Sequence, residues 1–185
     1  MKRIPTAICF HHTGDPSTEP QYEKVRAYHD RGAPDASGKL KWPKGFGIQY
    51  AYLIEKNGEI VQGRNEYDVT WHAGSKLWNY KAIGIALSGD LRTDKITNEQ
   101  LRAVCNLTNA LQKRFGIQDS MVVNHFGLKQ TECPGKRINA LVFEERVKHV
   151  DSRIHDLRKV IDRTEPPRKL MLERLLHRLL RFANV

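Results

Sequence analysis

The sequence contains no long apolar run. No segment approaches the ~20 consecutive apolar residues that a membrane-spanning helix needs. The start, MKRIPTAICFHHTG, offers only a seven-residue apolar stretch, which Pro5 interrupts and two histidines follow. That pattern is too poor for a secretory signal. We therefore expect the protein to be cytoplasmic as synthesised, so that reaching a substrate elsewhere would depend on another protein.

Cysteine is also scarce. Cys9, Cys105 and Cys133 form an odd set of three among 185 residues, unlike the even sets of a disulfide framework. Cys9 lies in an apolar run and Cys105 in a helical pattern, which is typical of core thiols. The sequence is therefore suited to a reducing compartment.

Negative charge is in deficit. The chain has 31 Lys and Arg against 21 Asp and Glu, so its formal net charge is 31 − 21 = +10. A basic excess of this size favours an acidic partner, either nucleic acid or an anionic envelope polymer. Net charge is the only support for nucleic acid, because no nucleic-acid-binding motif is visible.

Hydrophobic patterns predict an α/β domain with a mixed central sheet flanked by helices. Asn57-Gly58 between two apolar runs indicates a hairpin, because Asn-Gly adopts the positive φ angles of a tight turn. Thr97 to Gln100 has capping-box spacing and opens a helix that ends near Gly116. The predicted elements are strands at 4–10, 48–55, 59–62, 82–87 and 121–124, helices at 17–31 and from 97, and a surface loop at 33–47.

From residue 141 the pattern changes to two helices. The first carries an apolar seam at spacings of 4, 3, 4, 3 and 4, formed by Phe143, Val147, Val150, Ile154, Leu157 and Ile161. Such a seam is typical of heptad packing. Glu165-Pro166-Pro167 is expected to end it, and a second helix then sets leucines against arginines. We therefore predict a domain at 1–140 and a basic amphipathic helical extension at 141–185.

Two interpretations of the extension stay open. Its apolar seams pack on each other, on the preceding domain, or on a second chain, as most amphipathic stripes do. Alternatively, segment 164–185, with five basic and two acidic residues (5 − 2 = +3), contacts an anionic envelope or membrane surface. The oligomeric state does not follow from either.

A candidate metal site comes from residues far apart in the chain. His125 is followed eight positions later by Cys133, and His11-His12 lies near the start. Zinc takes imidazole nitrogen and thiolate sulfur, and two His with one Cys, leaving the fourth position to water, is a catalytic arrangement. The alternative is that Cys133 is a small buried hydrophobe and the histidines are unrelated loop residues.

Five segments in order resemble a known family. ICFHHTG, GFGIQYAYLIEKNGEIVQGR, TWHAG, AIGIALSGD and NHFGLKQTECPG span about residues 7–138. Together they resemble the zinc-dependent N-acetylmuramoyl-L-alanine amidases shared by phage endolysins and peptidoglycan-recognition proteins. Each segment alone is a weak signal, but five in order, with the His-to-Cys spacing intact, are specific. The resemblance implies the amidase/peptidoglycan-recognition fold over the first domain.

The resemblance also implies the metal ligands. His11, His125 and Cys133 would hold one Zn²⁺ per chain. His11 is chosen over His12 because the first histidine of the pair aligns with the family's ligand. His12 and His29 are expected to be structural, and His12 is a candidate to support the metal ligands.

Two residues are implied in catalysis. Tyr50 matches the family's catalytic tyrosine and would orient water or donate to the developing oxyanion. From periodicity alone, Tyr50 is a strand aromatic that shares the core face with Tyr52. Some phage members carry a lysine two residues before the ligand cysteine, whereas this chain has Thr131, as in the recognition-protein branch. Thr131 would offer a hydrogen bond, and Lys129 is the nearby lysine that is a candidate to compensate.

Substrate contacts are implied next to these residues. His72 in WHAG matches a histidine that lines the substrate groove, and Asn79 falls where the groove wall continues. The alternative for His72 is a hydrogen-bonded structural histidine beside Trp71. Trp71, Trp42 and Trp78 are candidate surfaces for stacking, although each is equally explained as packed.

The implied function is hydrolysis of peptidoglycan. The bond would be the amide between the lactyl group of N-acetylmuramic acid and L-alanine, cut by a zinc-activated water. The protein would be a phage or prophage endolysin that reaches the wall through a holin-type lesion. The alternative is a non-catalytic peptidoglycan receptor, which needs the groove but not the metal; Cys133 with Tyr50 argues against it.

Overall fold

The computed structural model describes residues 3–32, 37–40, 42–163 and 168–183. The chain forms two compact units, Met1–Asn139 and Ala140–Val185. The first contains a five-stranded sheet in the order β3-β2-β4-β1-β5. Its strands are β1 (Ala7–His12), β2 (Tyr52–Ile54), β3 (Ile60–Gln62), β4 (Ala82–Leu87) and β5 (Val122–Asn124).

The sheet is mixed, as the sequence predicted. β2, β4, β1 and β5 pair in parallel, and only the edge strand β3 runs antiparallel, to β2. Every residue of β4 is buried. A central parallel strand is covered on both faces, which explains why AIGIAL is a continuous apolar run rather than an alternating one.

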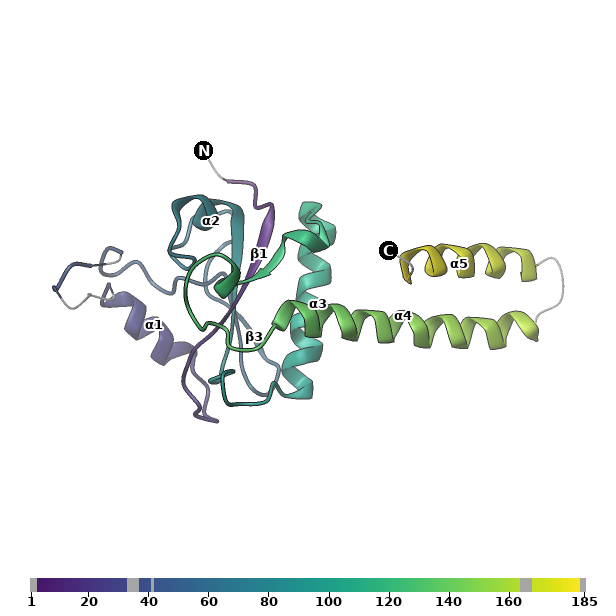
Figure 1. The fold of residues 1–185 in the computed structure, drawn as a ribbon, viewed down its shortest axis with the longest axis horizontal. Coiled ribbons are helices and arrows are strands. Elements are labelled where there is room, and N and C mark those ends of the chain that lie inside the picture. The colour runs from purple at the N-terminus through teal and green to yellow at the C-terminus, as the bar shows by residue number, and fades with distance from the viewer. Residues whose placement is uncertain (1–2, 33–36, 41, 164–167, 184–185) are drawn as a thin grey trace. The chain divides into compact units, whose positions relative to one another are not determined.

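Helices cover both faces of this sheet. α1 (Tyr22–Asp30) and α2 (Lys76–Lys81) lie on one side, and α3 (Asn98–Phe115) lies on the other (Figure 1). Two short 3-10 helices, η1 (Asp119–Met121) and η2 (His125–Gly127), flank β5. The flanked mixed sheet confirms the predicted fold class, and α2 is an element that the sequence pattern did not predict.

The predicted start of α1 at residue 17 is wrong. The helix begins at Tyr22, five residues later, because Pro20 disfavours helical backbone at the residue before it. The residue before the helix, Gln21, makes no side-chain cap hydrogen bond. Instead, Glu55 Oε1 accepts from Gln21 N at 2.8 Å and Tyr22 N at 2.9 Å. The cap therefore comes from beyond the end of β2, which no local sequence signal reveals.

The hairpin strands are shorter than predicted. β2 begins at Tyr52 instead of residue 48, so Tyr50 precedes the strand. The backbone is nevertheless tied to the sheet, because Ala51 N donates to Gly84 O at 2.9 Å. The capping box of α3 is confirmed: Thr97 and Gln100 exchange side-chain and backbone hydrogen bonds, and Gly116 ends the helix with φ +67°.

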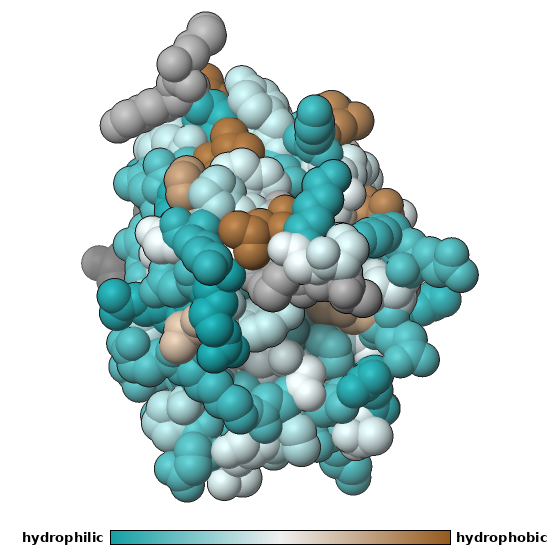
Figure 2. All heavy atoms as spheres, turned by 90° about the vertical axis from the view of Figure 1, so that its left-hand side faces the viewer, coloured by the Kyte–Doolittle hydropathy of each residue, from teal (hydrophilic) through white to brown (hydrophobic). Residues whose placement is uncertain are grey.

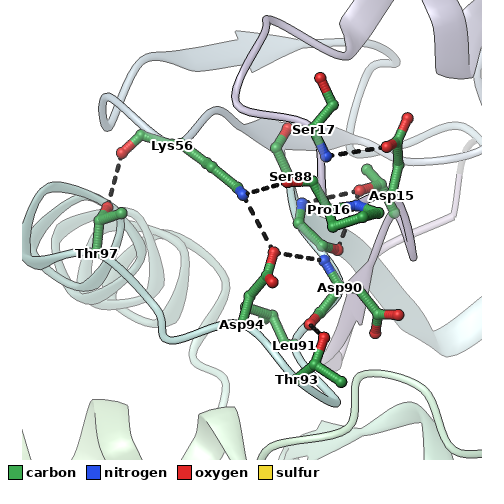
Figure 3. A network of polar contacts seen from close by, with 12 residues as sticks. Asp15, Pro16, Ser17, Lys56, Ser88, Asp90, Leu91, Thr93, Asp94 and Thr97 are labelled. Carbon is green, nitrogen blue, oxygen red and sulfur yellow. Dashed lines mark hydrogen bonds and ion pairs between the residues drawn. The ribbon is translucent and has the colours of Figure 1, made fainter.

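A polar network joins the ends of the strands (Figure 3). Lys56 Nζ donates to Pro16 O at 2.9 Å and to Asp94 Oδ2 at 3.1 Å. Asp94 Oδ2 also accepts from Asp90 N, at 3.1 Å. Thr97 Oγ1, at the start of α3, donates to Lys56 O. These contacts fix the loops that follow β1, β2 and β4, which border the candidate site.

The second unit contains most of α4 (Ile138–Asp162) and α5 (Arg168–Ala183). Ile154 and Ile161 of the predicted seam are buried, but Phe143 is 49% exposed, so the seam fails at its first position. The predicted break at Glu165-Pro166-Pro167 lies outside the described residues. Among the described residues, no helix is long and apolar enough to cross a membrane.

Candidate metal centre

Two parallel strands bring the candidate histidines together. β1 pairs with β5 in the register Phe10↔Asn124. His11 is the next residue within β1, and His125 directly follows β5. Parallel strands end at the same edge of a sheet, so residues in matching register meet there. The ring centroids of His11 and His125 are 4.5 Å apart.

Cys133 reaches the same edge on a fixed loop. Phe126 N donates to Cys133 O at 2.8 Å, and Cys133 N donates to Thr131 Oγ1 at 3.3 Å. Gly135, at φ +84°, packs so closely on the backbone of Arg92 that an added Cβ would lie 2.5 Å from its nitrogen. Arg92 also forms an ion pair with Glu132 at 3.2 Å. The thiol is therefore held by the loop that follows β4.

The three predicted ligands converge. One donor atom each of His11, His125 and Cys133 lies within 4.8 Å of the others, and Cys133 Sγ is 3.7 Å from His11 Nδ1. Among the described residues, neither buried ring nitrogen of His125 has a partner at normal hydrogen-bond geometry, although the Ala73 backbone lies close enough to act on its pKa. Buried polar atoms are seldom left unpaired. A metal ion bound by the trio would resolve this, and the nitrogen–nitrogen–sulfur set fits zinc.

The electrostatics of the trio suit a cation. Burial lowers the pKa of His11 and of His125, which keeps both rings in the neutral form that binds metals. Burial raises the pKa of the Cys133 thiol to about 11. An unassisted thiolate is therefore disfavoured at this position, and a bound divalent ion would stabilise it.

His72 contacts His11 on the side away from Cys133. Its Nδ1 lies 2.8 Å from His11 Nε2, and its Nε2 lies 3.2 Å from Ala82 O. Burial lowers the pKa of His72 to about 3, so the ring is neutral. His72 is 7% exposed, and both ring nitrogens are engaged. This geometry favours the structural alternative for His72 over a contact with substrate.

A second group of possible ligands lies deeper in the fold. Cys9, His11 and His72 also bring donor atoms within 4.8 Å of one another, but all three are buried. His11 and His72 already share a hydrogen bond, and burial raises the pKa of the Cys9 thiol. The outer trio, with His125 and Cys133 partly exposed, is the better site because solvent can reach it.

Tyr50 lies against the candidate ligands. Its ring centroid is 5.1 Å from that of His11, and burial raises its pKa. The phenol therefore stays protonated and able to donate. Tyr50 also lines a cavity of about 270 Å³ beside α1. The other lining residues are Thr13, Asp15, Gln21, Lys24, Val25, Tyr28, His29 and Arg31.

This cavity could not be found from the sequence. Its residues come from the loop after β1, from α1 and from the segment before β2, and no motif links them. His29, predicted to be structural, lines the cavity and also accepts a hydrogen bond from Gln49 N at 3.1 Å. The molecular surface on the α1 side is mainly hydrophilic, with apolar side chains scattered over it (Figure 2).

The remaining predicted residues have different environments. Thr131 supports the Cys133 loop through the hydrogen bond above. Lys129 packs on Gly74, where an added Cβ would lie 2.8 Å from its Cδ, and its charge contributes to the lowered pKa of His125. Asn79 is 5% exposed, and its amide oxygen accepts from Ala73 N at 2.8 Å. Asn79 thus holds the WHAG turn, and its contact with substrate stays a prediction.

The three tryptophans lie in different environments. Trp42 donates from Nε1 to His29 O, and Trp78 packs on the core beside Cys9. Trp71 is 37% exposed and meets Phe46 with ring centroids 5.1 Å apart. Of the three, Trp71 is the most exposed, and its stacking on substrate stays a prediction.

The fold and the convergence of His11, His125 and Cys133 agree with a comparison against known protein families. The sequence profile of the N-acetylmuramoyl-L-alanine amidase family matches residues 1–136. The chain therefore belongs to this family, as its motifs indicated.

Both branches of the family occur among the similar proteins. The chain resembles the structure of the N-acetylmuramoyl-L-alanine amidase LysC from Clostridium intestinale at 31% identity, covering 73% of this chain and 79% of that one, with a TM-score of 0.60. It also resembles the structure of the Ph2119 endolysin from a Thermus scotoductus bacteriophage at 26% identity, covering 77% of this chain and 88% of that one, with a TM-score of 0.62. The chain is 29% identical to peptidoglycan-recognition protein SC2 of Drosophila melanogaster, covering 64% of this chain and 58% of that protein.

Proposed function

We propose that the protein is a peptidoglycan hydrolase that cleaves the amide between the lactyl group of N-acetylmuramic acid and L-alanine. The observation that supports this most strongly is the convergence of one donor atom each of His11, His125 and Cys133. A receptor that only binds peptidoglycan has no need for a thiol and two imidazoles at one point.

The residues present would share the chemistry as follows. His11, His125 and Cys133 would hold zinc, which when bound lowers the pKa of a water from ~15.7 to ~7 and polarises the carbonyl. Tyr50 donates its phenolic proton in a hydrogen bond to the carbonyl oxygen as negative charge develops there. The cavity beside Tyr50 positions the chain of the substrate, and the hydrophilic surface around α1 suits a hydrated polymer (Figure 2).

Removal of the metal distinguishes a hydrolase from a receptor that only binds peptidoglycan. After dialysis against a chelator, release of new L-alanine amino termini from purified cell walls is expected to fall at least ~100-fold, and one equivalent of zinc is expected to restore it. Wall binding by the chelated protein, measured by co-sedimentation, serves as the control for folding. If the metal-loaded protein binds walls but releases no amino termini, the receptor is the correct function.

We further propose that α5 contacts an anionic envelope surface. Arg174, Arg178 and Arg181 are exposed on this helix, whereas Leu172, Leu176 and Leu179 are partly buried. Leu175, the fourth leucine of this stripe, is 43% exposed, so burial does not decide between the two interpretations of the extension. Exposed arginines on one helix face suit phosphate groups. Release of the protein through a holin-type lesion is part of the same proposal.

Charge removal tests this contact. Neutralising the three arginines to glutamine is expected to weaken co-sedimentation with phosphatidylglycerol vesicles by ~100-fold, because each basic residue near an anionic surface contributes ~1 kcal/mol. The matched control replaces Lys76, Lys95 and Lys113, which are exposed on the first unit, with glutamine. Equal losses in both variants would mean that only net charge matters, and the proposal for α5 would fail.

A further inference from the structure

We infer that His72 is a positioning residue, which holds His11 in the tautomer that can bind a metal through Nδ1. The inference rests on the proposed function only in taking zinc as the ion. It concerns a residue outside the predicted ligand trio, and it gives the histidine of the WHAG motif a role other than contact with substrate.

The contact between His72 and the backbone carbonyl of Ala82 determines which nitrogen donates in each hydrogen bond. His72 Nε2 lies 3.2 Å from Ala82 O. A carbonyl oxygen only accepts, so Nε2 must carry the hydrogen. In a neutral imidazole the other nitrogen is then an acceptor. His72 Nδ1 is therefore the acceptor in its contact with His11.

That assignment fixes the tautomer of His11. Its Nε2 lies 2.8 Å from His72 Nδ1 and must be the donor. The lone pair of His11 is then on Nδ1, and this is the nitrogen that lies 3.7 Å from Cys133 Sγ. The relay Ala82–His72–His11 thus directs the free lone pair to the point where the trio converges. A partner that fixes the second nitrogen of a ligand histidine is a general feature of metal sites.

The sheet is shaped to hold the His72 ring. A Cβ added to Gly84 of β4 would lie 2.9 Å from Cγ, 3.0 Å from Nδ1 and 3.1 Å from Cδ2 of His72. These distances are too short for any side chain, so glycine at this position lets the ring lie flat on the strand. The Asn79 contact with Ala73 N fixes the next residue. The orientation of His72 is therefore set by packing as well as by hydrogen bonds.

Two substitutions of equal shape isolate the acceptor. In His72→Asn the amide Oδ1 takes the place of the ring Nδ1, whereas in His72→Leu a methyl group does. Both variants lose the ring and the contact with Ala82 O. We expect His72→Leu to bind zinc 10- to 100-fold more weakly than the parent, and His72→Asn to recover most of that loss. Zinc affinity is measured by competition with a chromophoric chelator.

A second measurement reads the tautomer without metal or activity. In zinc-free protein labelled at the histidine nitrogens, NMR is expected to show His11 protonated at Nε2 in the parent and in His72→Asn. In His72→Leu we expect a mixture of both tautomers. Thermal unfolding of the zinc-free variants identifies any general loss of structure, which would lower the unfolding temperature of both variants.

The outcomes are distinct. Equal zinc affinity in His72→Leu and His72→Asn, or a parent His11 protonated at Nδ1, would overturn the inference. A parent protein that binds no zinc while showing the expected tautomer would instead overturn the proposed hydrolase.

Discussion

Cys133→Ala is expected to abolish stoichiometric zinc binding. The parent should purify with about one zinc per chain, and the variant with much less than one, because losing one of three protein ligands removes much of the affinity of a site. Amide hydrolysis should fall in parallel. The measurement is metal content by mass spectrometry after dialysis against a weak chelator, with release of L-alanine amino termini from walls measured on the same samples.

Cys105→Ala is the matched control for this experiment. Cys105 is a buried thiol on α3, and its replacement removes the same atoms without touching the candidate site. It should lower the free energy of unfolding modestly and leave the zinc content unchanged. Full zinc occupancy in Cys133→Ala would mean that Cys133 is not a ligand, and it would favour the deeper group that contains Cys9.

Tyr50→Phe is expected to lower kcat by about 100- to 1,000-fold, the usual effect of losing one donor to a developing oxyanion. The phenol is protonated because burial raises its pKa, so only its hydrogen bond is lost. Zinc content should not change, since Tyr50 is not a ligand in this assignment. The readout is the rate of amino-terminus release from a soluble muropeptide at saturating substrate.

Tyr52→Phe provides the comparison for Tyr50→Phe. Tyr52 lies two residues away and donates to the buried carboxylate of Glu66 at 2.5 Å. Its loss should reduce the free energy of unfolding by ~1 kcal/mol and leave kcat near that of the parent. If Tyr50→Phe keeps more than a tenth of the parent kcat, Tyr50 is a packed aromatic, as its periodicity first indicated.

Sequence patterns correctly predicted the elements whose bounds depend on contacts between residues close together in the chain. β4 was predicted with its bounds, because a fully apolar run of six residues has few alternatives. The capping box at Thr97 and the glycine stop at Gly116 were confirmed for the same reason, since each is a contact within a few residues. α2 has neither an apolar stripe nor a side-chain cap, so nothing local announces it.

Long-range contacts set the limits of prediction at the site. The meeting of His11 with His125 follows from strands that pair only in the folded sheet, and motif resemblance supplied what periodicity did not. The start of α1 depends on Glu55, a residue 33 to 34 positions away. The hydrogen bonds of His72 span 61 residues to His11 and 10 to Ala82. Sequence analysis therefore left its role open between groove and support.

The adjacent histidines of β1, His11 and His12, contact different parts of the fold. His11 faces the candidate ligands, while His12 Nδ1 accepts from Leu91 N at 3.0 Å in the loop that packs against Gly135. Side chains of neighbouring strand residues point to opposite faces. Inserting one amino acid ahead of Phe10 would therefore move His11 into the place of His12 and bring Phe10 to the place that faces His125 and Cys133. The shifted strand would keep an imidazole beside Leu91, but it would offer no nitrogen ligand to His125 and Cys133 and no donor to His72.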